Sequence, residues 1–368
     1  MLTFSLMLQK VQRKGGQQDS HVFLCKCRAG ESADRKKKEN IMKRRLLRVS
    51  TWLVVTFLLA GCASQVDTSR VYVPEEGGIN FEKITDESLE ILVNPSVNRV
   101  GSRLQWWVNP LFCISQDGKT LAYNVYKNEK RNVFIKSLDV RGASTQRTTR
   151  TSVNDVCISP NGKDLCFSEV VGLNSRLYLT SATQGTMVTQ VSPVNVADYG
   201  PCFSKDGSRI FFSRSDNGNY SIWSYDVERG SFSNYCYGMN PSVFSDEEFL
   251  CTRKNSMNNY EIWLINFVKG SESILLSQEN HSFTTGSVSP NGKWIVCVGN
   301  TIPNGSNSSE NLDIYVVRTD GSRLTQLTYH PGHDCSPVWA PDGKSIYFLS
   351  QRGTKKGEYN IWKMNFNL

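Results

Sequence analysis

Short apolar runs separated by glycine-containing turns recur along most of the chain. In one stretch, Val156-Cys-Ile158 and Leu165-Cys-Phe167 flank the turn Ser159-Pro-Asn-Gly-Lys163. Asn-Gly or Asp-Gly between two apolar runs is the strongest short-range signal of a β-hairpin. The pattern therefore predicts an all-β chain that is assembled from hairpins.

The turn is the anchor of an internal repeat. A sixth, degenerate copy at Ser245-Asp-Glu-Glu248 completes the series, and the spacings between successive anchors are 44, 45, 41, 44 and 51 residues. A fixed period of this size indicates a repeat architecture. The five clear copies are Ser115-Gln-Asp-Gly-Lys119, Ser159-Pro-Asn-Gly-Lys163, Ser204-Lys-Asp-Gly-Ser208, Ser289-Pro-Asn-Gly-Lys293 and Ala340-Pro-Asp-Gly-Lys344.

Each copy contains a third apolar run with an aromatic residue at a matched position. Most copies close with a fourth run, such as Gln326-Leu-Thr328. Four strands in each of six units of about 45 residues are typical of a β-propeller. We therefore predict a six-bladed β-propeller of four-stranded blades over residues 79–368. The matched aromatic residues are Phe134, Tyr178, Trp223, Trp263, Tyr315 and Trp362.

The last copy lacks a fourth run of its own, so its outer strand must come from another part of the chain. Lys83-Ile-Thr85 matches Gln326-Leu-Thr328. A blade without its fourth strand would leave an open sheet edge. We therefore expect residues 79–85 to be the outer strand of the last blade and to close the ring.

These turns resemble the Ser-Pro-Asp-Gly-Lys turns that mark each blade in the TolB-like propeller family. The resemblance covers residues 79–368 and implies the fold. TolB itself also has a separate N-terminal domain, which the 17 residues 62–78 are too short to form. The resemblance therefore implies no role in translocation.

A basic segment and an apolar run precede Cys62. Lys43, Arg44, Arg45 and Arg48 come before the run 52–60, which is too short for a membrane span of about 20 residues. This order describes a secretory signal. Leu59-Ala60-Gly61-Cys62 resembles the bacterial lipobox, which implies lipidation at Cys62; a buried apolar helix ending in a free cysteine is the alternative.

The positive charge of the chain lies before this cysteine. The whole chain has a net charge of +8, but residues 1–61 hold 13 Lys and Arg against 4 Asp and Glu. We therefore expect no nucleic-acid partner. Because a signal peptide begins near its basic segment, we expect Met42 to be the true start, 1–41 a wrongly assigned extension, 42–61 the signal peptide and 62–78 a flexible tether.

Propeller topology places the short Asp-Gly turns on one face and the long loops on the other. About 18 extra residues within 86–106 belong to the second face, which suggests a binding role there. Trp and Tyr together with Asp and Asn around a channel mouth could hold a peptide or a sugar, although any one of them could instead cap a loop. The candidate binding residues are Trp106, Trp107, Asn109, Asp155, Asp198, Tyr199, Asn240, His333 and Asp334.

Catalytic motifs are missing from the sequence. His330 and His333 flank a Pro-Gly turn, a spacing that aligns them poorly for a metal. We find no nucleophile elbow, zinc-protease motif or phosphate loop, so we expect no cofactor, no metal and no catalytic residue. Cys157 and Cys166 could face each other across a hairpin, but we expect the propeller cysteines to be buried thiols.

The sequence thus favours a lipid-anchored, non-enzymatic envelope protein with a monomeric propeller that binds a protein or glycan partner. We expect it at the bacterial outer membrane, facing the periplasm. The alternative is a carbohydrate-active, lyase-like enzyme with its site at the propeller channel. Three metal-ligating side chains converging at the channel mouth would favour the enzyme.

Overall fold

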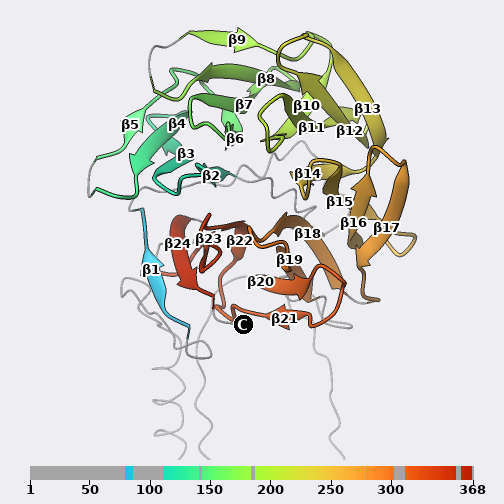
Figure 1. Cartoon of the computed structure of the whole chain (residues 1–368). Helices are drawn as coiled ribbons and strands as arrows, with labels where there is room; N and C mark the ends of the chain where they lie inside the picture. Colours follow the sequence, from blue (N-terminus) through green and yellow to red (C-terminus); the bar gives the residue numbers. More distant parts are fainter. Residues whose placement is uncertain are drawn as a thin grey trace, which may run out of the picture. The chain divides into compact units, whose positions relative to one another are not determined.

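The computed structural model describes residues 79–85, 111–140, 143–183, 187–279, 281–301, 311–353 and 358–366. These residues form six antiparallel sheets of four strands each. The sheets follow one another around a ring, as Figure 1 shows. The predicted six-bladed β-propeller is confirmed. The predicted signal peptide and tether lie outside the described residues.

The blades are numbered here from the first complete sheet, and each runs from its inner to its outer strand. Blade 1 contains β2 (Phe112–Ile114), β3 (Thr120–Lys127), β4 (Lys130–Ser137) and β5 (Thr145–Gln146). Blade 2 contains β6 (Val153–Ile158), β7 (Asp164–Val171), β8 (Asn174–Ser181) and β9 (Val188–Gln190). Blade 3 contains β10 (Ala197–Phe203), β11 (Arg209–Asp216), β12 (Asn219–Asp226) and β13 (Phe232–Tyr237).

The second half of the ring repeats this order. Blade 4 contains β14 (Met239–Val243), β15 (Glu248–Lys254), β16 (Tyr260–Asn266) and β17 (Ser271–Leu276). Blade 5 contains β18 (His281–Val288), β19 (Trp294–Thr301), β20 (Asn311–Arg318) and β21 (Thr325–Gln326). Blade 6 contains β22 (Asp334–Trp339), β23 (Ser345–Ser350) and β24 (Asn360–Asn365), and its outer strand is β1 (Phe81–Lys83).

The ring is closed by β1, as the sequence predicted. This strand lies beside β24 in Figure 1 and pairs antiparallel with it. Phe81 lies opposite Met364 in the pairing. The pairing continues beyond the strand, because Ile84 N donates to Ile361 O at 2.8 Å. One apolar core cluster joins blades 5, 6 and 1, and Phe81 and Ile84 pack against it. Closure therefore covers both the sheet edge and the core beneath it.

The repeated turns are built by their own side chains. Ser115 Oγ donates to Asp117 Oδ1 at 2.5 Å and accepts the N–H of Thr120 at 2.9 Å. Gly118 adopts a φ of +74°, which a side chain would disfavour. Ser159, Ser204 and Ser289 make equivalent bonds with Asn161, Asp206 and Asn291. The Ser-x-Asp/Asn-Gly pattern is therefore explained by hairpin geometry alone.

The topology defines two faces of the propeller. The turns between the first and second strands of each blade lie on the turn face. The inner and third strands begin, and the second and fourth strands end, on the opposite loop face. In blades 2–6 the pairing of the inner strand with the second strand shifts register, for example between Tyr199 and Cys202. Such a bulge re-aims the side chains of the inner strand near the channel mouth.

Candidate functional site

The predicted binding residues that the structure describes belong to the loop face, but they differ in how accessible they are. Trp106, Trp107 and Asn109 lie outside the described residues. Asp155, Asp198, Asn240 and Asp334 are buried, whereas Tyr199 and His333 are partly exposed. The bonds that each described residue makes decide what it can do.

Asp198 is held by a two-pronged ion pair inside blade 3. Its Oδ1 accepts from Arg214 Nε at 2.8 Å, and its Oδ2 accepts from Arg214 Nη2 at 3.0 Å. Ser192 Oγ donates to the same carboxylate at 2.7 Å. The guanidinium of Arg214 lies 4.4 Å from the ring centre of Trp223. These bonds give Asp198 a structural role that joins the inner strand to the rest of its blade.

Asp334 makes a comparable pair in blade 6. Its Oδ2 accepts from Arg352 Nη2 at 2.6 Å, and both side chains are fully buried. The guanidinium of Arg352 lies 4.0 Å from the ring centre of Phe81 in the closing strand β1. This ion pair therefore sits where the ring is closed.

Asp155 and Asn240 connect neighbouring blades. Asp155 Oδ2 accepts from Ser168 Oγ in its own blade at 2.7 Å and from the backbone N–H of Gly200 in blade 3 at 2.8 Å. The backbone N–H of Asn240 in blade 4 donates to Ser213 Oγ in blade 3 at 2.8 Å. Asp155 thus joins the inner strands of blades 2 and 3, and Asn240 joins the inner strand of blade 4 to the second strand of blade 3.

His333 is bonded on two sides. Its ring Nδ1 accepts the backbone N–H of Leu312 at 3.3 Å. Its backbone N–H donates to Gln351 Oε1 at 3.0 Å. Burial lowers the pKa of the imidazole ring. In the part of the chain that the structure describes, no three His, Cys, Asp or Glu side chains are grouped as a metal site requires. His333 therefore supports the loop before β22.

Tyr199 is one of four tyrosines that gather on the loop face of blades 3 and 4. Tyr220 is the second residue of β12, Tyr260 is the first residue of β16, and Tyr237 ends β13. Burial, with smaller contributions from the neighbouring Tyr220, Asp155 and Asp198, raises the pKa of Tyr199 to about 12. Burial likewise raises the pKa of Tyr260 to about 12, with contributions from Tyr220 and Tyr237.

These four residues, Tyr199, Tyr220, Tyr237 and Tyr260, are the tyrosine cluster. The first, second and fourth are partly exposed, and Tyr237 has 49% of its surface exposed. Sequence reasoning found only Tyr199. A signal for two others was present, because Tyr220 and Tyr260 each precede the repeated tryptophan by three residues, as Tyr359 does in blade 6. Tyr359 differs from Tyr220 and Tyr260 because it is buried, with 5% of its surface exposed.

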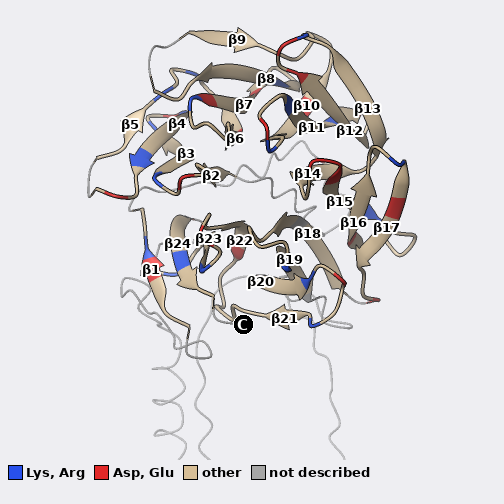
Figure 2. Ribbon diagram, in the orientation of Figure 1, with Lys and Arg blue, Asp and Glu red and all other residues tan. Residues whose placement is uncertain are grey.

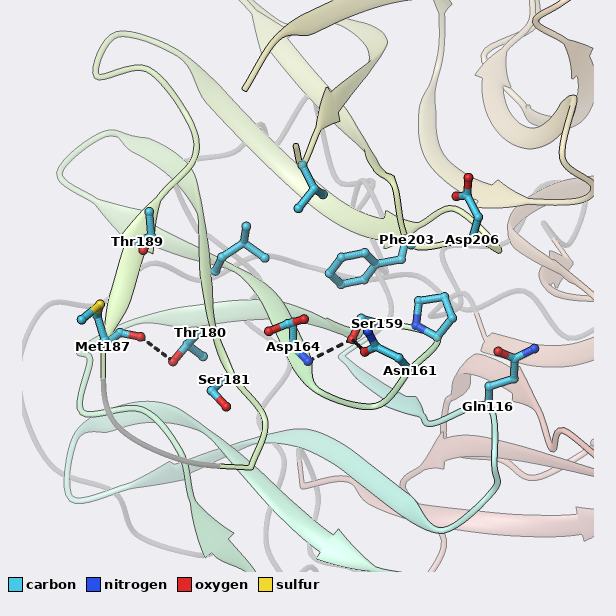
Figure 3. A pocket seen from close by; sticks show the side chains of 14 residues that line it. Gln116, Ser159, Asn161, Asp164, Thr180, Ser181, Met187, Thr189, Phe203 and Asp206 are labelled. Atoms are coloured by element: carbon cyan, nitrogen blue, oxygen red, sulfur yellow. Dashed lines mark hydrogen bonds between the residues drawn. The ribbon is translucent and has the colours of Figure 1, made fainter. Parts of the chain in front are cut away.

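A groove of about 670 Å³ lies on the opposite, turn face, between blades 2 and 3. Figure 3 shows Phe203 close to Ser159 and Asn161 among the lining side chains, with Met187 to one side beside Thr180. Met187 is 82% exposed. Within the groove, Thr180 Oγ1 donates to Met187 O at 2.9 Å. The groove is a second candidate binding surface. It is lined by one aromatic ring, that of Phe203, whereas the tyrosine cluster has four.

The charges of the described residues are mixed in sign. Lys and Arg are interspersed with Asp and Glu among the blades, as Figure 2 shows. Among these residues no helix has the length and apolar character needed to cross a membrane.

Comparisons with known proteins agree with the fold. The family model described as PD40, TolB beta propeller domain, matches residues 55–304. The comparison with curated proteins found no match. A putative TolB from Agrobacterium tumefaciens superposes with a TM-score of 0.55 at 18% identity, covering 71% of this chain and 91% of that chain.

Two further solved structures are similar. TolB from Acinetobacter baumannii gives a TM-score of 0.53 at 17% identity, covering 68% of this chain and 64% of that chain. An oligogalacturonate lyase from Vibrio parahaemolyticus gives a TM-score of 0.50 at 14% identity, covering 78% and 97%. At such low identity these likenesses show the fold alone.

Proposed function

The chain belongs to the TolB β-propeller domain family, and on that premise we propose that its propeller is a rigid platform that binds a protein or glycan partner at the loop face. The proposal is carried by the tyrosine cluster. Tyrosine offers a large contact surface at low entropic cost and is enriched at binding interfaces. The buried carboxylates around it serve the scaffold, which leaves contact rather than chemistry to the exposed groups.

The position of the cluster supports a rigid platform. Tyr199 lies one residue from Asp198, whose ion pair with Arg214 fixes the inner strand. Gly238 N donates to Tyr220 O at 3.0 Å, which ties the end of blade 3 to the start of β12. A surface that is ordered before binding loses little entropy on association. Four rings on an ordered backbone are therefore suited to a partner that is recognised by shape and contact.

We further propose that Cys62 carries a lipid anchor that holds the protein at the outer membrane, facing the periplasm. The support is the order of basic segment, apolar run and lipobox-like cysteine in the sequence. The anchor places the propeller near the membrane surface, and the tether of residues 62–78 lets the loop face reach a partner in the envelope.

A capture experiment tests the binding proposal. The full chain with a C-terminal affinity tag is used to isolate partners from envelope extracts, and immobilised glycans are tested in parallel. The double substitution Tyr220→Ser and Tyr260→Ser is expected to reduce capture by more than tenfold, because buried aromatic anchors dominate interface energies. The matched control is Tyr126→Ser, an exposed tyrosine in blade 1 outside the cluster.

The outcome separates the two faces. Undiminished capture by a double variant that still folds would contradict binding at the tyrosine cluster. Loss of capture by Met187→Asp, which alters the turn-face groove, would move the site to that groove. Thermal unfolding of each variant shows whether the propeller remains folded.

A further inference from the structure

Two cysteines from neighbouring blades meet at the boundary between blades 3 and 4. Cys236 lies in the outer strand β13 of blade 3, and Cys251 lies in the second strand β15 of blade 4. Both belong to one packed cluster. The chain passes directly over Cys251 just after Cys236, since a Cβ at Gly238 would lie 3.0 Å from Cys251 Sγ. The two thiols are close enough to interact, since each shifts the pKa of the other.

The two thiols have unlike surroundings. Cys251 is 1% exposed, whereas Cys236 is partly exposed to solvent. Interactions with Cys251 and with the neighbouring Arg253 lower the pKa of the Cys236 thiol. The interaction with Cys236, together with burial, raises the pKa of Cys251. The accessible cysteine is therefore the one that is stabilised as a thiolate, which is the environment of a reactive cysteine.

Arg253 is held in place next to this pair. Its Nε donates to Tyr237 O at 2.8 Å, and its two terminal nitrogens bind the carboxylate of Glu272 at 2.7 and 2.9 Å. Its guanidinium lies 4.5 Å from the ring centre of Trp263. The positive charge beside Cys236 is thus fixed by three separate contacts, and only 12% of this side chain is exposed.

We propose that Cys236 and Cys251 form an oxidisable dithiol, a site that reacts with disulfide oxidants such as oxidised glutathione or the disulfide of a thiol-oxidising protein. This inference does not depend on the proposed binding function. Solvent exposure assigns the two roles. The partly exposed Cys236 is the nucleophile that attacks the oxidant, and the buried Cys251 is the resolving thiol that attacks the mixed disulfide.

The reaction balances in two exchange steps. The Cys236 thiolate attacks one sulfur of the oxidant, a mixed disulfide forms, and the other sulfur leaves as a thiolate that takes up a proton. Cys251 then loses its proton to solvent and attacks Cys236 Sγ, which releases the second thiol of the oxidant. The protein loses two electrons and two protons, and one disulfide of the oxidant becomes two thiols. The product joins blade 3 to blade 4 covalently.

A second cysteine pair provides an internal control. Cys157 and Cys166 lie directly opposite each other in β6 and β7 of blade 2. Both are buried, and burial raises the pKa of Cys157 well above its usual range. Proximity alone would oxidise this pair as readily as the other. The proposal requires that the Cys236–Cys251 pair react much faster, because only Cys236 combines access with a cationic neighbour.

The test is a timed reaction of the full chain with oxidised glutathione. Remaining thiols are alkylated at each time, and disulfide-linked peptides are identified by mass spectrometry. We expect the Cys236–Cys251 peptide to form first and Cys157 and Cys166 to stay reduced. Oxidation should raise the Tm by several degrees, because the cross-link constrains the unfolded chain. The variant Cys236→Ser should show neither the peptide nor the Tm shift.

Two further variants guard against a structural explanation. Cys251→Ser should stop at a glutathione adduct on Cys236. Arg253→Gln should slow the first step several-fold while the final disulfide remains the same, since the guanidinium acts by stabilising the thiolate. If Cys236 and Cys251 remain alkylatable throughout the reaction, or if the Cys157–Cys166 disulfide forms at least as fast, the proposal is overturned.

Discussion

Thr85 Oγ1 accepts the backbone N–H of Ile361 at 3.0 Å, although the two residues are 276 positions apart. The same bond is made inside three other blades, by Thr148 with Val133, Ser192 with Leu177 and Thr328 with Ile314, at 2.8 to 2.9 Å. The same hydrogen bond, from a third-strand backbone N–H to a Thr or Ser hydroxyl, therefore holds the closing strand and the ordinary fourth strands. The end of blade 6 is completed by the beginning of the propeller.

Deleting residues 79–85 is expected to lower the Tm by many degrees and to reduce solubility. The deletion removes the ladder to β24, the Thr85 bond and the cover over Phe348. Repeat folds depend on neighbour contacts, so an open blade loses much of its support. Thermal unfolding measures the effect. A truncation to Arg70 is the control and should leave the Tm unchanged; equal Tm values for both forms would contradict the role of this strand.

Replacing Arg352 with Met is expected to destabilise the protein by about 3–5 kcal/mol, because the substitution leaves the Asp334 carboxylate buried without its cation. Urea unfolding gives the change in the free energy of unfolding. The control is Lys119→Met, since the Lys119–Asp139 pair is 3.7 Å apart and both side chains are mostly exposed. That control should change stability by less than about 1 kcal/mol. Similar changes in the free energy of unfolding from the two substitutions would contradict the larger contribution of the buried Arg352–Asp334 pair.

Alkaline titration should reveal the tyrosine cluster. An unperturbed phenol ionises near pH 10, whereas the pKa values of Tyr199 and Tyr260 are raised to about 12. Between these pH values the folded chain holds protons that the unfolded chain has lost. The stability contributed by the neutral phenols is present below about pH 10 and falls as the pH rises toward 12.

Phenolate absorbance checks this expectation. A late-titrating group of tyrosines should appear in the folded protein and vanish on unfolding. The substitution Tyr260→Phe should reduce the late amplitude and leave the rest of the curve unchanged. A single transition near pH 10 for all tyrosines of the folded chain would contradict the raised pKa values of Tyr199 and Tyr260.

Processing of the N-terminus is a separate expectation. A gene that begins at Met42 should yield a lipidated protein whose first residue is Cys62, and Cys62→Ala should abolish lipidation. Intact-mass measurement of the membrane fraction detects the acylated species. Peptides from residues 1–41 in the native host would contradict the proposed start, and an unmodified Cys62 would contradict the anchor.

The sequence was most informative where the physical cause is local. The bond from Thr120 N to Ser115 Oγ spans five residues, so the hairpin turns could be recognised from a short pattern. The closing strand could be recognised because Lys83-Ile-Thr85 repeats a pattern found at Gln326-Leu-Thr328. In both cases a Ser or Thr hydroxyl accepts a backbone N–H at a fixed position of the repeat.

The partners of the acidic residues could not be read in this way. Asp198 in β10 lies opposite Arg214 in β11. The register of these two strands shifts between Tyr199 and Cys202, so the pairing cannot be counted back from the hairpin turn. The sequence suggested an exposed acid at a channel mouth, whereas the carboxylate is fully buried in an ion pair. The tyrosine at the start of the third strand recurs in blades 3, 4 and 6, but its exposure depends on neighbours that are distant in the sequence. Repeat position therefore identifies a candidate without showing whether it reaches the surface.

Site-specific photocross-linking in cells tests the proposed binding face most directly. A photoreactive amino acid replaces Tyr237 in the tyrosine cluster, where 49% of the side chain is exposed, or Met187 at the turn-face groove, where 82% is exposed. The account predicts a cross-linked partner from position 237 and none from position 187. Cross-links that arise from position 187 and not from position 237 would contradict binding at the loop face.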